Sequence, residues 1–248
     1  MVVTSRKLQD QMGIDSKIAD FFANERPVPV NNRFWERKRI YLSAGFGFLT
    51  IPFVFDLMYK AGIPREVLLD HQHVNLMEQG FDRLKRYELG ELSREQFIQE
   101  CMSLLEGRIR QQHLAVDLAA VLTGAPARYF SFETTYPALA RSDFFLFTLV
   151  DLDISDEWVQ RFLPYWYSIA RPILLLDDFK DLVQDRLLKE ENTIIELGND
   201  KAAIEAAFQL GLSDASYLGA LNPLLAKRVE GYLNEAMMLR HIREILEG

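Results

Sequence analysis

LLLDDFKDLVQD, residues 174–185, carries four aspartates directly after the apolar run RPILLL. In an α-helix the 3.6-residue period places three of these acids on one stripe and the fourth beside it. Carboxylates at this spacing repel one another, so a compensating charge is expected. One interpretation is a solvated helix face neutralised by nearby lysine and arginine side chains, and the other is a site for a divalent cation, which takes oxygen ligands. The four candidate ligands, called here the acidic quartet, are Asp177, Asp178, Asp181 and Asp185.

Composition predicts one compact domain over residues 1–248, because 49% hydrophobic residues can form a sizeable core. The formal net charge of −8 argues against a nucleic-acid partner, since phosphate contacts need clustered Lys and Arg. The single Cys101 cannot form an internal disulfide and fits a small buried hydrophobic position better than a nucleophile. The start MVVTSRKLQDQMG lacks the apolar core of a signal peptide, so a cytoplasmic location is expected.

Helix start and stop signals predict an all-α fold. Ser93 opens the capping-box pattern SREQ and predicts a helix that runs to about Leu122. Ser155, followed by two acids, predicts a further long helix that Pro164 and Pro172 interrupt or kink. No stretch shows sustained period-two alternation, although FFLFTLV (144–150) has the composition of a strand.

The apolar segment IYLSAGFGFLTIPFVFDLMY, residues 40–59, is a candidate membrane span because of its length. It contains Pro52 and Asp56 and stands alone in an otherwise mixed composition. We therefore expect no membrane span and interpret this segment as a central helix of the core.

The segment from Ile154 to Glu196 resembles the trans-prenyltransferases of the class I isoprenoid synthase superfamily. Their second aspartate-rich motif has the form DDxxD with a further Asp four positions on, and DDFKDLVQD matches all four acids. The resemblance implies a single-domain helical bundle around a central cavity, with the acidic quartet at its open end. It also implies that the quartet binds Mg²⁺ and, through the metal, a prenyl diphosphate, and that the protein forms a homodimer. The metal would neutralise the diphosphate leaving group in prenyl transfer or terpenoid cyclisation.

A basic segment near the N-terminus is similar to a second family feature. Family members carry a Gly-Lys-Arg-x-Arg-Pro type segment before a long apolar helix, and ERKRIYLSAGFGFL places Arg37, Lys38 and Arg39 there. The resemblance implies that these three residues bind the diphosphate. Without it, they are a basic flank that solvates a helix start.

The first aspartate-rich motif of the family is not recognisable before Asp177. Glu78 and Asp82 form an i,i+4 pair that is either a reduced version of that motif or two surface acids. Leu174 also stands where the family commonly has glutamine. Two functions are therefore predicted as alternatives: an Mg²⁺-dependent isoprenoid synthase-like enzyme, or a catalytically degenerate helical protein that binds a prenyl ligand or a partner chain.

Overall fold

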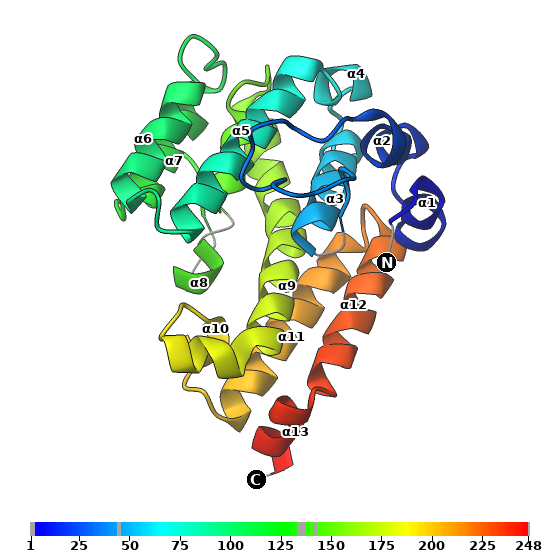
Figure 1. Cartoon of the computed structure of the whole chain (residues 1–248), viewed down its shortest axis with the longest axis vertical. Helices are drawn as coiled ribbons and strands as arrows, with labels where there is room; N and C mark the ends of the chain where they lie inside the picture. Colours follow the sequence, from blue (N-terminus) through cyan, green and yellow to red (C-terminus); the bar gives the residue numbers. More distant parts are fainter. Residues whose placement is uncertain (1–2, 44–45, 133–136, 141–142, 248) are drawn as a thin grey trace. The chain divides into compact units, whose positions relative to one another are not determined.

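The computed structural model describes residues 3–43, 46–132, 137–140 and 143–247, and within them it contains helices and no strand (Figure 1). The all-α prediction is confirmed for these residues. The 144–150 run forms a 3₁₀-helix, η2 (Asp143–Leu149), and a π-helix, η1, covers Phe21–Glu25. The α-helices are α1 (Ser5–Met12), α2 (Ser16–Asp20), α3 (Phe46–Lys60), α4 (Arg65–Leu68), α5 (His71–Glu88), α6 (Arg94–Leu104), α7 (Gln112–Leu122), α8 (Pro137–Ala140), α9 (Asp156–Leu188), α10 (Thr193–Glu196), α11 (Lys201–Leu218), α12 (Pro223–Met237) and α13 (Arg240–Glu247).

The described residues divide into two compact units, each assembled from separate stretches of chain. The first unit contains the described residues within 1–6, 15–132 and 143–163. The second contains those within 7–14, 133–142 and 164–248. The single domain predicted over 1–248 stays a prediction.

Helix α3 forms the apolar centre of the first unit, but it starts later than predicted. The segment 40–43 is bent and the helix begins at Phe46, so the expected helix over 40–59 is wrong at its start. Asp56 is 1% exposed, and its carboxylate accepts a hydrogen bond from the Asp15 backbone N–H at 2.7 Å and one from Lys60 Nζ at 2.6 Å. These bonds offset the cost of burying its charge. The intrusive acid in the apolar run is thus a satisfied structural group.

The helix predicted from Ser93 to Leu122 is two helices. The capping box is present, and the end of α7 at Leu122 agrees with the prediction. Between them Gly107 takes a φ of +71°, a conformation that ends a helix and favours glycine. Gln111 then caps α7 through its side chain, and the backbone N–H groups of Arg110 and Gln111 donate to the Val150 carbonyl. Contacts from a distant segment therefore decide the break.

Helix α9 begins as predicted and continues through both prolines. The Trp158 backbone N–H donates to Ser155 Oγ at 3.2 Å, and the helix then runs for 33 residues with Pro164 and Pro172 inside it. The prolines do not interrupt the helix, and a kink at either of them stays a prediction. The two units divide between Leu163 and Pro164, within this helix.

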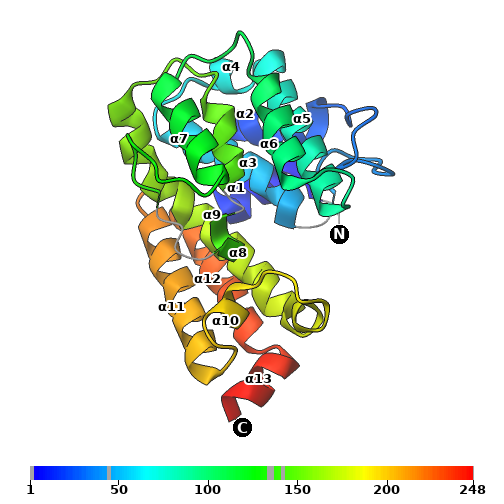
Figure 2. The same ribbon diagram turned by 90° about the vertical axis from the view of Figure 1, so that its left-hand side faces the viewer.

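The second unit is built on α11 and α12, which lie side by side in both views (Figures 1 and 2). Gly211 permits the approach, since a Cβ there would lie 3.0 Å from both methyl groups of Leu233. Arg171 of α9 forms a two-point ion pair with Asp214 of α11, with Nε–Oδ2 at 2.8 Å and Nη2–Oδ1 at 2.5 Å. A Cβ on Gly211 would also lie 3.6 Å from Leu175 of α9, so the helix that carries the acidic quartet contacts α11 through both an apolar side chain and an ion pair.

No helix in the described part of the chain is both long enough and apolar enough to cross a bilayer.

Candidate functional site

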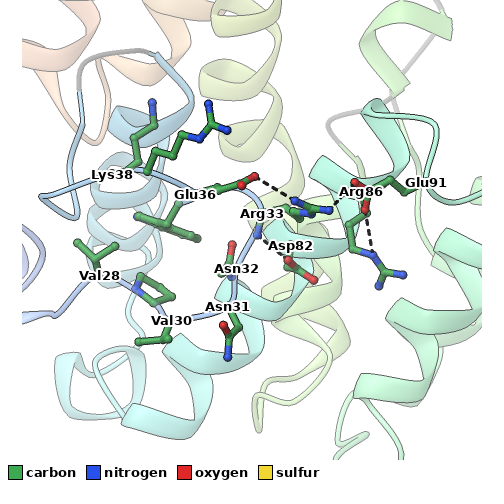
Figure 3. A pocket seen from close by; sticks show the side chains of 13 residues that line it. Val28, Val30, Asn31, Asn32, Arg33, Glu36, Lys38, Asp82, Arg86 and Glu91 are labelled. Carbon is green, nitrogen blue, oxygen red and sulfur yellow. Dashed lines mark hydrogen bonds and ion pairs between the residues drawn. The ribbon is translucent and has the colours of Figure 1, made fainter.

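A pocket of about 770 Å³ lies in the first unit between the loop 26–41 and helix α5 (Figure 3). The loop contributes apolar and basic side chains, and α5 and the turn after it contribute acids and one arginine. Three of the sequence-predicted site residues line it, namely Arg37, Lys38 and Asp82. The other lining residues are Val28, Pro29, Val30, Asn31, Asn32, Arg33, Trp35, Glu36, Arg86 and Glu91.

Hydrogen bonds between helix α5 and the loop 26–41 hold the loop in place. Asp82 Oδ1 accepts from the Arg33 backbone N–H at 2.7 Å, and Asn32 Nδ2 donates to the Glu78 carbonyl at 2.8 Å. Asn32 Oδ1 in turn accepts from the Phe34 backbone N–H at 3.0 Å. In Figure 3 Asp82 lies directly beside the loop at Arg33. Because buried polar groups need partners, these bonds give the loop one defined path.

Glu78 anchors the two ends of the same loop. Its carboxylate accepts two hydrogen bonds from Arg26, at 2.8 Å from Nε and 2.7 Å from Nη2, and one from the Tyr41 hydroxyl at 3.0 Å. Burial and the Glu78 charge raise the pKa of Tyr41 well above its ordinary value, and the hydrogen bonds to Glu78 raise the pKa of Arg26. Glu78 is therefore a structural counter-ion of the loop.

The structure contradicts one of the two interpretations of Glu78 and Asp82. Glu78 is 2% exposed and Asp82 is 9% exposed, so the expectation of two surface acids is wrong. Both carboxylates accept hydrogen bonds from the loop 26–41. In the structure they hold the loop that lines the pocket, and a role as a first aspartate-rich motif stays a prediction.

The four cations of the pocket fall into two kinds. Arg33 pairs with Glu36 at 3.2 Å and Glu91 at 3.0 Å, and Arg86 pairs with Glu100 at 2.8 Å. Figure 3 shows Arg33 between its two acids. By contrast, neither Arg37 nor Lys38 forms an ion pair with any residue that the structure describes.

Arg37, Lys38 and Arg39 differ in whether they line the pocket. All three are exposed, and Lys38 Nζ lies 5.6 Å from the ring centroid of Phe48. Arg39 does not line the pocket. Residues 40–43, which follow them, are not helical, so the three residues are not the first turn of α3.

Two of the lining residues have a left-handed backbone conformation. Asn31 has a φ of 55° and Arg37 a φ of 59°, in the left-handed region. Asparagine tolerates that conformation, whereas for arginine it costs about 1–2 kcal/mol. Strain of this kind persists where surrounding contacts impose it and is enriched at binding sites. The loop bonds to Glu78 and Asp82 supply those contacts.

The acidic quartet belongs to the second unit and is divided by burial. Asp178 is 1% exposed and Asp185 is 8% exposed, whereas Asp177 is exposed and the Asp181 side chain is 37% exposed beside Lys180 Nζ at 3.3 Å. Among the described residues, no group of three or more His, Cys, Asp or Glu side chains is arranged to hold a metal ion. The geometry does not fit a four-carboxylate Mg²⁺ centre, and magnesium binding stays a prediction, as does the central cavity.

Sequence reasoning missed Asn31, Arg33, Trp35 and Arg86. The Pro- and Asn-rich stretch NERPVPVNN signals a loop, but nothing in it shows which helix the loop packs against. Comparisons of the chain with protein-family models, with curated proteins and with solved structures yield no match.

Proposed function

We propose that the protein binds an organic diphosphate in the pocket between the loop 26–41 and α5, with prenyl diphosphates as the ligand class that the sequence resemblance suggests. The observation that carries the proposal is the pair Arg37 and Lys38. Both line the pocket, both are exposed, and neither has an ion-pair partner among the described residues.

The charge balance makes this pair distinctive. The chain has a formal net charge of −8, and the other two pocket cations, Arg33 and Arg86, are already paired with acids. Two adjacent cations that form no ion pair with a described residue suit a ligand that brings several negative charges of its own. Arginine adds paired N–H donors that match phosphate oxygens, and lysine adds a point charge.

The rest of the lining suits an apolar substituent on the ligand. Val28, Pro29 and Val30 form part of the wall, and Trp35, 2% exposed, also contributes to it. These four apolar residues are the smaller part of a lining whose other nine described residues are polar or charged. A prenyl chain would use the wall while the diphosphate contacts Arg37 and Lys38.

Binding, without prenyl transfer, is the activity proposed. Ionisation of an allylic diphosphate relies on metal ions held by several carboxylates. The described lining of this pocket has three carboxylates, and each already has a partner: Asp82 accepts a hydrogen bond from the Arg33 backbone, and Glu36 and Glu91 form ion pairs with the Arg33 side chain. The acidic quartet is divided as described above. This favours the ligand-binding alternative over the enzyme.

Titration calorimetry with inorganic pyrophosphate and with farnesyl diphosphate tests the proposal. We expect the double variant R37A/K38A to bind both ligands at least about tenfold more weakly, which corresponds to about 1.4 kcal/mol or more. Arg39→Ala is the matched control, because Arg39 is an adjacent exposed cation outside the pocket, and its affinity should stay within about twofold of the wild type.

Farnesyl diphosphate should bind more tightly than pyrophosphate if the apolar wall contributes. Equal affinity of R37A/K38A and the wild type would overturn the proposed site. An equal loss in Arg39→Ala would show that only the general surface charge matters.

A further inference from the structure

We infer that Asp178 and Asp185 form a structural latch that holds the segment 189–196 against helix α9, and that they are not ligands of a metal ion. The latch consists of these two carboxylates together with Asn192 and Thr193. It concerns the second unit and does not rest on the proposed diphosphate pocket, whose residues lie in the first unit.

Asn192 is the centre of the latch. Its Nδ2 donates to the Asp178 backbone carbonyl at 2.8 Å and to Asp185 Oδ2 at 2.8 Å. Its Oδ1 accepts from the backbone N–H groups of Ile194 at 2.9 Å and Ile195 at 3.4 Å, and so caps α10. One amide side chain thereby joins two turns of α9 to the start of α10.

Asp178 makes the second connection. Its Oδ2 accepts from the Thr193 backbone N–H at 3.0 Å. Asp178 and Asn192 are each 1% exposed, and Thr193 is fully buried. A carboxylate that accepts from a backbone N–H inside the protein satisfies a donor which would otherwise remain buried and unpaired.

The geometry of the latch explains the spacing of the acids. Asp178 and Asp185 are seven residues apart, so they lie on the same face of α9 two turns apart. Asp177 is exposed and the Asp181 side chain is 37% exposed, so the other two acids of the quartet are the solvated ones. Mg²⁺ usually keeps several waters and takes one or two carboxylates, so its ligands need oxygens that solvent can reach. Asp178 and Asp185 are 1% and 8% exposed, and each already uses a carboxylate oxygen in a hydrogen bond inside the protein.

The test combines thermal unfolding with Mg²⁺ titration on the full chain after treatment with a chelator. We expect Asp178→Ala and Asn192→Ala to lower the unfolding midpoint by roughly 3–10 °C, because each leaves buried groups without partners. Asp181→Ala is the matched control, because its side chain is 37% exposed, and its midpoint should stay within about 2 °C of the wild type.

Asp178→Asn distinguishes the latch from a metal ligand. An asparagine oxygen can still accept from Thr193, so this variant should fold and be less destabilised than Asp178→Ala. Millimolar Mg²⁺ alone should shift the unfolding midpoints of Asp178→Asn and the wild type equally, and a shift of zero in both proteins also meets this expectation.

Two results would overturn the latch. One is an Mg²⁺-induced rise in the wild-type midpoint that disappears in Asp178→Asn and in Asp185→Asn. The other is a midpoint of Asn192→Ala within about 2 °C of the wild type.

Discussion

Gly80 of α5 shows how one missing methyl group determines packing in the first unit. A Cβ at this position would lie 2.5 Å from Cε1 of Phe147 and 3.4 Å from Cζ of Phe144. Both rings belong to η2, and Phe144 and Phe147 stack with their centroids 4.9 Å apart. The 3₁₀-helix therefore packs directly on the backbone of the helix that also carries Glu78 and Asp82.

Gly80→Ala should destabilise the protein by about 1–3 kcal/mol, because two buried rings would have to move. Gly231→Ala is the control, since Gly231 lies in α12 with no atom within 4 Å of the added carbon. That substitution should leave stability unchanged or raise it by up to about 1 kcal/mol. Urea unfolding measures both. Equal stability of Gly80→Ala and the wild type would contradict the observed packing.

Cys101 is a buried thiol, as its place in an apolar stripe predicts. It is 2% exposed, and burial raises the pKa of its thiol to about 12. We expect it to react with a thiol reagent at pH 8 only when the protein unfolds, since the thiolate is the reactive species. Labelling with and without denaturant measures this. Rapid labelling of the folded protein would disprove it.

The same pKa shift predicts how stability depends on pH. The thiol of the unfolded chain has a pKa near 8.5. Between about pH 9 and 12 the unfolded state loses this proton while the folded state keeps it, so the contribution of Cys101 to stability falls as pH rises. Cys101→Ala should have a shallower decline of unfolding free energy over this range than the wild type. Identical slopes for the two proteins would contradict the shift.

At the scale of elements, Gly107 and Gln111 separate α6 from α7. The apolar stripe of residues 97–113 continues across the break, so hydrophobic periodicity alone predicts one helix. The structure ends α6 at Leu104 and restarts at Gln112, with Gln111 buried and its Nε2 donating to Asp156 Oδ1 at 2.7 Å. The backbone N–H groups of Arg110 and Gln111, which a continuous helix would bond internally, donate to the Val150 carbonyl.

Gly107→Ala should destabilise the protein by about 1 kcal/mol, because alanine disfavours the left-handed conformation although space is available there. Gly124→Ala, also at positive φ with open space, should show a loss of similar size. Chemical denaturation measures the two effects. A stability gain in Gly107→Ala would mean that a continuous helix is accessible.

At the scale of the whole molecule, neither compact unit corresponds to one continuous stretch of sequence. Each unit is assembled from separate stretches, and α9 crosses the division without a break in the helix. Unfolding of either unit would therefore disrupt α9, part of which belongs to the other unit. This continuity favours one cooperative domain.

We expect a single urea transition that is the same for both units. Trp35 and Trp158 belong to the first unit and Trp166 to the second, so variants that keep only Trp35 or only Trp166 report on each unit separately. Their fluorescence midpoints should coincide with each other and with that of far-UV circular dichroism. Two separated midpoints would divide the chain into two domains.

Local sequence signals determined the helical class and many of the helix ends. The capping box at Ser93, the cap at Ser155 and the end at Leu122 depend on side chains within one turn of the backbone they satisfy. The residues in such interactions are close together in the sequence, so the sequence pattern alone predicts them. The burial of Cys101 likewise follows from the apolar period of its own helix.

The roles of the acids depended on tertiary structure. Glu78 and Asp82 form an ordinary i,i+4 pair in sequence, and only the packing of the loop 26–41 on α5 gives them Arg26 and the Arg33 backbone as partners. In the same way, the repeat of acids along α9 does not distinguish Asp177 from Asp178. The path of residues 189–196 does, because it brings Asn192 and Thr193 to one side of the helix. A carboxylate becomes a ligand, a latch or a surface charge according to the groups that approach it from distant parts of the chain.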